Sequence, residues 1–197
     1  MLECTLRKIV VFTSVSLNGY FEGPNHDISW HNLDDELNKF AIEQLRESDT
    51  ILFGRRTYQL FEDAFPKTAA DPATSKDNLE IAYLINNMNK IVYSRTLQSV
   101  REKENWRNVK LLRQVNPEEI IQWKQQSGKN ISAGGNELVA SLAENGLIDE
   151  FRLMINPIAL TDGTSLLHGI RKRLHLRLLK TQTFKSGNIL LTYEPAT

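Results

Sequence analysis

Short runs of β-branched and apolar residues alternate with amphipathic segments along this chain of 197 residues, and this alternation restricts its fold more than any other feature. Residues 7–14 read Arg-Lys-Ile-Val-Val-Phe-Thr-Ser, a run typical of a strand that is buried on both faces. Residues 33–47 then place apolar side chains from Leu37 to Leu45 at helical spacings, with acidic residues at the start, where a helix favours negative charge. Repetition of this order favours an α/β fold in which helices flank a mostly parallel sheet.

The same pattern predicts seven to eight strands in one domain that spans residues 1–197. No linker divides the chain, and its length is normal for a single domain. The last two strands are expected to form an antiparallel hairpin that turns at Ser186-Gly187, and residues 63–76 a surface loop. These last two strands are expected at residues 176–184 and 188–193. The remaining strands are expected at residues 50–53, 90–94, 108–112, 129–133 and 149–155, and the remaining helices at residues 55–62, 78–87, 117–126 and 136–144.

The charges of the chain are balanced, since 24 lysines and arginines offset 24 aspartates and glutamates. A balanced chain has no overall field that draws it to nucleic acid or to an anionic membrane, so any anion must be bound locally. No apolar run approaches the roughly 20 residues that span a bilayer, and residues 1–4 lack the pattern of a secretory signal. We therefore expect a cytoplasmic protein with a small-molecule substrate and no nucleic-acid or membrane partner.

Three loops begin where a predicted strand ends. In open α/β sheets ligands bind at the carboxyl ends of the strands, where helix N-termini offer free amides. The first loop is Gly54-Arg55-Arg56-Thr57, in which the glycine lets a phosphate approach the backbone and the arginines offer paired donors. Taken alone, this segment could equally be a tight turn with solvated arginines.

The second loop, Ser94-Arg95-Thr96, sets two hydroxyls beside an arginine, which suits the 2′-phosphate that distinguishes NADPH from NADH. Its alternative interpretation is an arginine that caps a loop. The third loop has the adjacent glycines Gly134-Gly135 between a strand and a helix, where they let the main chain pass close to a pyrophosphate. One pair of glycines is weak evidence, but three such loops in succession favour a nucleotide site.

Other catalytic patterns are missing from the sequence. There is no G-x-G-x-x-G after the first strand, no Walker A lysine loop, no H-E-x-x-H and no G-x-S-x-G elbow. The four histidines, His26, His31, His168 and His175, lack the spacing of metal ligands, so no metal is expected.

Five segments follow one another in a characteristic order: 14–20 (Ser-Val-Ser-Leu-Asn-Gly-Tyr), 54–58 (Gly-Arg-Arg-Thr-Tyr), 90–97 (Lys-Ile-Val-Tyr-Ser-Arg-Thr-Leu), 134–138 (Gly-Gly-Asn-Glu-Leu) and 146–150 (Gly-Leu-Ile-Asp-Glu). No one of them is diagnostic, but together they resemble the dihydrofolate reductase superfamily over nearly the whole chain. The resemblance is closer to the branch related to the C-terminal reductase domain of riboflavin biosynthesis.

The resemblance implies a single-domain dihydrofolate reductase-like fold that binds NADPH. The first two loops would hold the adenosine half of the cofactor, and the paired glycines would meet its pyrophosphate. Proteins of this branch often form homodimers, so the resemblance also implies that two copies pair. The cofactor contacts expected in this chain are Gly19, Gly54, Arg55, Thr57, Ser94, Arg95, Thr96, Gly134, Gly135 and Asn136.

The resemblance further implies that residues 16–30 form a mobile loop that closes over nicotinamide and substrate and excludes water during hydride transfer. Ser16 and Trp30 are the substrate contacts expected in this loop. An equally good interpretation makes Trp30 an anchor of the loop.

The substrate end of the sequence departs from the family pattern. Folate-reducing members carry a Trp-Asn-Leu-Pro-like segment before an acidic residue, whereas residues 30–36 read Trp-His-Asn-Leu-Asp-Asp-Glu and lack the proline. Asp35, five residues after the tryptophan, is the first candidate for a catalytic carboxylate, and Asp27 is the second. The alternative for each is an acid that caps a helix or faces water.

The leading hypothesis is therefore an NADPH-dependent oxidoreductase that transfers hydride to a small heterocyclic or carbonyl-type substrate, of which pterins and pyrimidines are examples. A protein of the same fold that binds the nucleotide without turnover is the second hypothesis. A true dihydrofolate reductase is the third.

Overall fold

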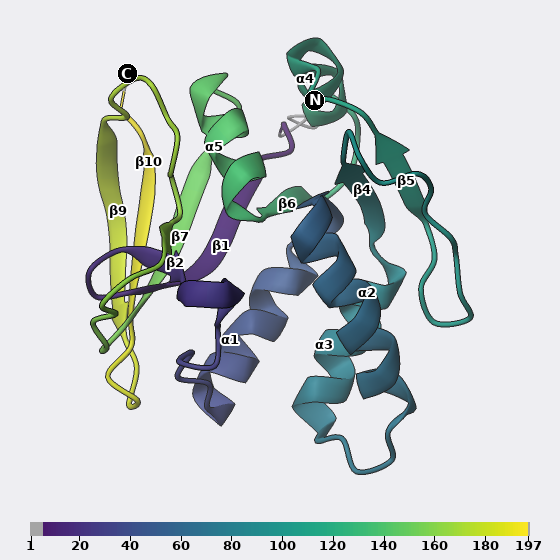
Figure 1. The fold of residues 1–197 in the computed structure, drawn as a ribbon, viewed down its shortest axis with the longest axis horizontal. Coiled ribbons are helices and arrows are strands. Elements are labelled where there is room, and N and C mark those ends of the chain that lie inside the picture. The colour runs from purple at the N-terminus through teal and green to yellow at the C-terminus, as the bar shows by residue number, and fades with distance from the viewer. Residues whose placement is uncertain (1–5, 197) are drawn as a thin grey trace, which may run out of the picture.

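The structure, a computed structural model, describes residues 6–196, so residues 1–4, which entered the prediction of localisation, lie outside the described residues. One eight-stranded sheet runs through the molecule (Figure 1). Its strands are β1 (Ile9–Ser16), β3 (Ser48–Gly54), β4 (Asn89–Tyr93), β5 (Val109–Leu112), β6 (Asn130–Gly134), β7 (Glu150–Asn156), β9 (Leu176–Thr183) and β10 (Ile189–Pro195), and their order across the sheet is β5-β4-β3-β6-β1-β7-β10-β9.

The six strands from β5 to β7 pair in parallel, whereas β10 pairs antiparallel with both β7 and β9. The hairpin between β9 and β10 turns at Gly187, whose φ of +87° suits glycine better than any other residue. Two backbone hydrogen bonds between Phe184 and the turn close the hairpin, from Phe184 N to Asn188 O and from Gly187 N to Phe184 O. The predicted fold class, a mostly parallel sheet with a C-terminal antiparallel hairpin, is confirmed.

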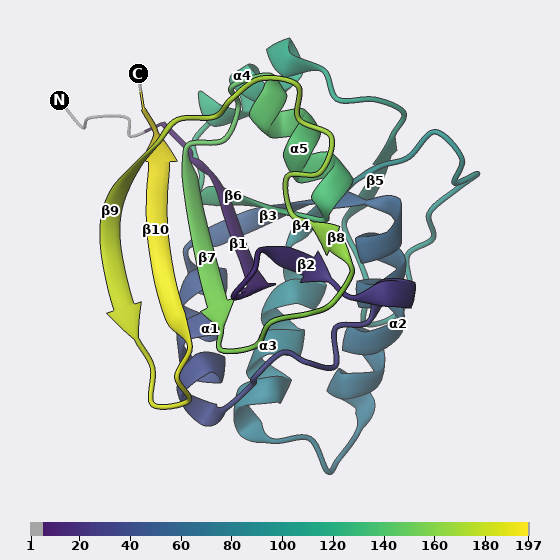
Figure 2. The same cartoon turned by 60° about the vertical axis from the view of Figure 1, so that its left-hand side comes forward.

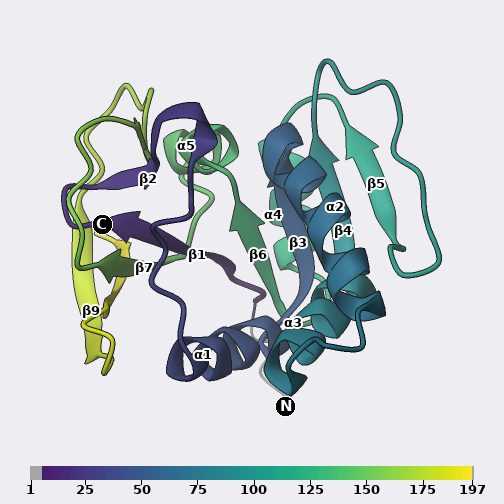
Figure 3. The same ribbon diagram turned by 60° about the horizontal axis from the view of Figure 1, so that its bottom comes forward.

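Helices cover both faces of the sheet. They are α1 (Asp35–Arg46), α2 (Arg55–Ala70), α3 (Lys76–Asn87), α4 (Pro117–Lys124) and α5 (Asn136–Glu144). Because side chains alternate along a strand, Leu52 of β3 is buried among residues of α4 and α5, while its neighbour Phe53 is buried among residues of α2 and α3. Figure 3 shows α1 and α3 below the sheet and α5 above it.

The predicted loop over residues 63–76 is wrong for residues 63–70, because α2 continues through Pro66 to Ala70. A proline removes a backbone donor and normally ends a helix. Here aromatic packing holds the helix together: Phe61 packs edge-on against Phe53 of β3 and against Phe65, with ring centroids 5.1 and 4.8 Å apart. Tertiary contacts thus override the local signal.

A second, two-stranded sheet joins β2 (Tyr20–Glu22) and β8 (Thr164–Ser165), and the sequence did not predict it. Figure 2 shows these two strands side by side, in front of the main sheet. Gly163, with a φ of +151°, lies against the backbone of Glu22, where a Cβ would overlap the carbonyl oxygen. Glycine therefore lets the segment after β7 lie against the loop that follows β1. Among the described helices, none has the length and apolar character needed to cross a membrane.

Candidate functional site

The three loops singled out in the sequence leave from neighbouring strands. In the parallel register Phe53 lies beside Gly134, and Gly54 lies beside Tyr93. The carboxyl ends of β6, β3 and β4 are therefore adjacent at one edge of the sheet. This is the arrangement in which α/β sheets bind ligands.

Two helices that begin at this edge lack the usual N-terminal cap. Asp34, Ser75 and Asn116 cap α1, α3 and α4 with side-chain oxygens. By contrast, α2 begins after Gly54 and α5 after Gly135, and within residues 6–196 no side chain caps either of them. The first backbone amides of both helices thus remain available to an anion, which the positive end of each helix dipole also attracts.

Gly135 brings these two helix N-termini close together. Its φ is +96°, and a Cβ at this position would lie 3.6 Å from the backbone nitrogen of Gly54 and 2.7 Å from Oγ1 of Thr57. A side chain here would therefore collide with the Thr57 hydroxyl beside the backbone amide of Gly54. This cradle, formed by Gly54, Thr57 and Gly135, fits a phosphate or pyrophosphate group.

The other expected cofactor residues in this part of the site make fewer close contacts than Gly135 and Thr57 do. Asn136 is the first residue of α5 and is half-buried, and Gly134 ends β6. Arg55 is exposed and donates only a long hydrogen bond, 3.4 Å, to Gln59. Gly19 lies in the turn after β1, with a φ of +86°.

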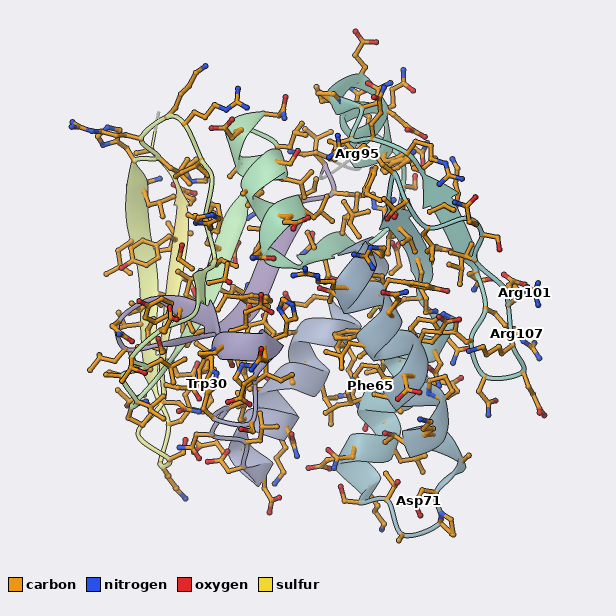
Figure 4. All side chains as sticks on the ribbon, in the orientation of Figure 1. Trp30, Phe65, Asp71, Arg95, Arg101 and Arg107 are labelled. Atoms are coloured by element: carbon orange, nitrogen blue, oxygen red, sulfur yellow. The ribbon has the colours of Figure 1, made fainter. Side chains whose placement is uncertain are left out.

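The Ser94 hydroxyl organises its own loop. Ser94 is 7% exposed, and its Oγ accepts hydrogen bonds from the backbone nitrogens of Thr96 (3.3 Å) and Leu97 (2.9 Å). Arg95 and Thr96 are exposed, and no side-chain hydrogen bond or ion pair holds Arg95 within the part of the chain that the structure describes. Figure 4 shows Arg95 well apart from Trp30. The Ser94 loop therefore presents one unengaged guanidinium at the end of β4.

A cavity of about 660 Å³ lies between α1, α2 and the strands β1, β3 and β6, and the segment after β1 closes one side of it. Thr57 and Gly135 of the cradle line this cavity, so the cradle and the cavity are continuous. Most of the other lining residues are apolar: Phe12, Phe21, Ile28, Leu33, Ala41, Leu45, Ile51, Phe53, Leu60, Phe61, Phe65, Ile81, Ile85 and Ala133.

Neither expected substrate contact is among the described residues that line the cavity. Ser16 is the last residue of β1, and its hydroxyl donates to Asn18 Oδ1 and accepts from Tyr20 N in the following turn, both at 2.9 Å. Trp30 donates from Nε1 to the carbonyl oxygen of Asp27 at 2.9 Å. Both side chains therefore hold the loop in its conformation, and contact with a substrate stays a prediction.

The two candidate carboxylates are exposed. Asp27 accepts a hydrogen bond from Ser29 N at 2.9 Å, and its bonds with Ser29 lower the pKa of its carboxyl group. Asp35 is the first residue of α1, and the preceding Asp34 is the side chain that caps the helix, 2.7 Å from Leu37 N. Neither carboxylate lines the cavity as the described residues form it. Their catalytic role stays a prediction.

Of the ionisable groups that do line the cavity, the sequence had singled out Arg56 as a phosphate donor, whereas sequence reasoning missed Glu22, His26 and His31. His26 Nδ1 lies 2.9 Å from Glu22 Oε1 and 3.5 Å from the Arg56 guanidinium. His31 Nε2 is buried and has no hydrogen-bond partner in the described part of the chain. Burial lowers the pKa of His31, against the opposing effect of the Asp27 carboxylate.

The only signal for the three missed residues in the sequence is the presence of two histidines in the segment after β1. Metal-ligand spacing, the criterion applied to the histidines, does not detect a ligand-binding role. Across residues 6–196, no cluster of three or more His, Cys, Asp or Glu side chains could hold a metal ion.

Known proteins resemble this chain both in sequence and in architecture. The family model described as the RibD C-terminal domain matches residues 7–190. The uncharacterized protein YyaP of Bacillus subtilis (strain 168) is 33% identical over 188 residues, which cover 95% of this chain and 94% of YyaP.

Solved structures agree. A putative riboflavin biosynthesis protein from Shewanella sp. PV-4 superposes with a TM-score of 0.70 at 19% identity, over 96% of this chain and 99% of that one. A second neighbour is the diaminohydroxyphosphoribosylaminopyrimidine deaminase/5-amino-6-(5-phosphoribosylamino)uracil reductase from Thermotoga maritima. It has a TM-score of 0.68 at 13% identity, and the match covers 97% of this chain and 57% of the Thermotoga maritima chain. The fold is thus the dihydrofolate reductase-like fold of riboflavin biosynthesis reductases, and the chain belongs to the RibD C-terminal domain family.

Proposed function

We propose that this protein is an NADPH-dependent reductase that transfers hydride to a small heterocyclic or carbonyl-type acceptor. The observation that carries the proposal is the cradle at Gly54, Thr57 and Gly135, where two uncapped helix N-termini meet beside a largely apolar cavity. Helix N-termini in this arrangement bind the phosphates of nucleotides. The reductase named among the structural neighbours supports the same reaction class.

In this proposal the cradle holds the pyrophosphate and the Arg95 guanidinium binds the 2′-phosphate. NADPH, when bound, supplies the hydride, while the protein supplies binding and orientation. The cavity holds the acceptor, and the segment that contains Glu22 and His26 covers it and excludes water. Excluding water protects the hydride donor from side reactions and strengthens polar contacts inside the cavity.

Two measurements test the proposal. Purified protein is titrated with NADPH and with NADH, and NADPH absorbance is then followed with dihydrofolate, diaminopyrimidine precursors and simple quinones. We expect preferred binding of NADPH and its consumption with at least one acceptor. Equal affinity for both cofactors would contradict the assignment of Arg95.

A second function, nucleotide binding without turnover, is favoured by one observation: neither Asp27 nor Asp35 lines the cavity as the described residues form it. Binding of NADPH with no consumption across the panel would support it. That one domain spans residues 1–197, that two copies pair and that the protein is cytoplasmic remain our predictions. Sedimentation velocity of the purified protein tests the pairing.

A further inference from the structure

The cavity has a largely apolar lining, which is unusual for a site that binds phosphorylated metabolites. Five phenylalanines line it: Phe12, Phe21, Phe53, Phe61 and Phe65. Phe61 lies edge-on to both Phe53 and Phe65, and the partly exposed phenylalanines can pair with a further aromatic ring in the same geometry. The walls therefore offer much apolar area to a planar ligand and few partners to a sugar.

The charged groups of the cavity do not form a strong anion site. Glu22 is 8% exposed, and its carboxylate faces His26, which in turn lies 3.5 Å from the Arg56 guanidinium. Arg56 and His26 are exposed. A phosphate beside Arg56 would approach the buried Glu22 carboxylate, and repulsion between the two charges opposes this.

His31 lines the cavity and carries a buried polar atom that has no partner among the described residues. Its Nε2 is buried without a partner in the described part of the chain, and a buried polar atom of this kind destabilises the protein until it is paired. An imidazole nitrogen pairs with a ring carbonyl or a ring N–H, according to its tautomer. The ring of His31 is held edge-on to Trp30, with centroids 4.5 Å apart.

The residue that follows His31 is firmly anchored. Asn156 Oδ1 accepts from the backbone nitrogen of Asn32 at 2.8 Å, and Asn188 Nδ2 donates to its carbonyl oxygen at 2.8 Å. Asn156 and Asn188 are buried on β7 and just before β10. The anchored backbone of Asn32 thus restricts where the His31 ring can point, as a binding residue requires.

We propose that the cavity binds an uncharged, planar aromatic or quinone-type ring, which forms a hydrogen bond with His31 Nε2, in preference to a phosphoribosylated pyrimidine. The inference rests on the proposed function in one respect, that the cavity is the acceptor half of the site. The partly exposed phenylalanines Phe12, Phe21, Phe61 and Phe65 contribute affinity, and His31 fixes the orientation of the ring. The cradle at Gly135 is left for the cofactor.

Binding to the full chain without cofactor tests this inference. The probe is 2,3-dimethyl-1,4-naphthoquinone, whose two methyl groups block addition of thiols, and uridine 5′-monophosphate is the comparison ligand; both are titrated by calorimetry. We expect the quinone to bind about tenfold more tightly than the nucleotide. Both titrations are repeated with Gly135→Ala, in which the added methyl group blocks the phosphate cradle, and tighter binding of the nucleotide to this variant would overturn the proposal.

Substitutions of His31 test the polar contact. His31→Leu should weaken quinone binding about tenfold, whereas His31→Gln, which keeps a polar atom near the position of Nε2, should weaken it by less than about threefold. His168→Leu is the matched control, because His168 is exposed after β8, and it should bind as the unaltered protein does. Unchanged quinone binding by a folded His31→Leu variant would also overturn the proposal.

A separate titration with NADPH distinguishes the two proposals. Quinone binding without NADPH binding would refute the proposed function and leave the cavity assignment in place. Consumption of NADPH by another acceptor, with no quinone binding, would refute the cavity assignment alone.

Discussion

The hydroxyl of Thr57 and the α-carbon of Gly135 face each other across the junction of two helix N-termini, so closely that a Cβ on Gly135 would lie 2.7 Å from Thr57 Oγ1. Thr57 is in the first turn of α2, and Gly135 immediately precedes α5. The residues are 78 positions apart, and their proximity follows from the neighbouring positions of β3 and β6 in the sheet. This contact makes the cradle sensitive to a single methyl group.

Gly135→Ala is expected to weaken NADPH binding by about tenfold or more, because the added methyl group displaces Thr57 and occupies the phosphate cradle. It should also cost about 1 kcal/mol of unfolding free energy, since alanine is strained at a φ of +96°. Fluorescence titration and urea unfolding measure the two effects.

Gly146→Ala is the control that separates the effect of backbone strain from the effect of a blocked cradle. Gly146 has a φ of +63°, and among the described residues no atom lies within 4 Å of the point where a Cβ would stand. This variant should lose a similar amount of stability and keep its affinity for NADPH. Equal losses of affinity in both variants would mean that strain alone acts.

Arg95→Ala is expected to lower NADPH affinity about tenfold and to leave NADH affinity unchanged. The reason is that a hydrogen bond to a charged group contributes about 1.5–3 kcal/mol, and only NADPH carries the 2′-phosphate. Arg101→Ala is the control, because Arg101 is an exposed arginine of the same β4–β5 connection and Figure 4 shows it apart from Arg95. An equal loss of affinity for NADPH and NADH would mean that Arg95 contacts a part of the nucleotide other than the 2′-phosphate.

Asn156→Ala is expected to release the segment that holds His31. It leaves the backbone nitrogen of Asn32 without its acceptor, at a cost of about 1–3 kcal/mol. Hydrogen exchange should show faster exchange at the Asn32 amide. Asn18→Ala, which removes bonds to Leu160 on the exposed side of the loop, should leave that amide protected. Unchanged protection in Asn156→Ala would show that other contacts hold the segment.

Lys90→Met is expected to destabilise the protein by about 2 kcal/mol at neutral pH. The Lys90 ammonium is fully buried and donates to the carbonyl oxygens of Asn86 (2.8 Å), Met88 (2.9 Å) and Arg107 (3.0 Å). Methionine fills the volume but leaves these carbonyls unpaired. Lys110→Met, at an exposed lysine of β5, is the control and should change stability by less than about 1 kcal/mol.

The same lysine predicts how stability depends on pH. Burial lowers the pKa of Lys90 from 10.5 to about 8, with Glu102 opposing the shift. Above pH about 8 the unfolded chain retains this proton while the folded protein releases it, so the unfolding free energy contributed by Lys90 rises with pH. The difference in stability between the unaltered protein and Lys90→Met should grow between pH about 8 and 9.5, and a constant or shrinking difference would refute the assignment.

The local sequence predicted where most strands and helices lie along the chain, and the reason is visible in particular residues. The helix expected at residues 136–144 is α5 as observed, and the hairpin expected at Gly187 is present. Both depend on neighbours in the chain: a glycine before an amphipathic run, and a glycine between two apolar strands. The continuation of α2 past Pro66 was missed because the contact of Phe61 with Phe53 joins α2 to β3, a contact that the local sequence around the proline does not show.

What the sequence determined by itself was the strand–helix alternation and the glycines that end β3 and β6, because periodicity and backbone freedom are properties of adjacent residues. Only the tertiary structure decided which side chains share the cavity. Phe12, Phe53 and Phe65 come from β1, β3 and α2, and His31 acquires an unpaired buried nitrogen only when these elements pack around it. Burial and the loss of water are collective results of packing, so a single segment cannot encode them.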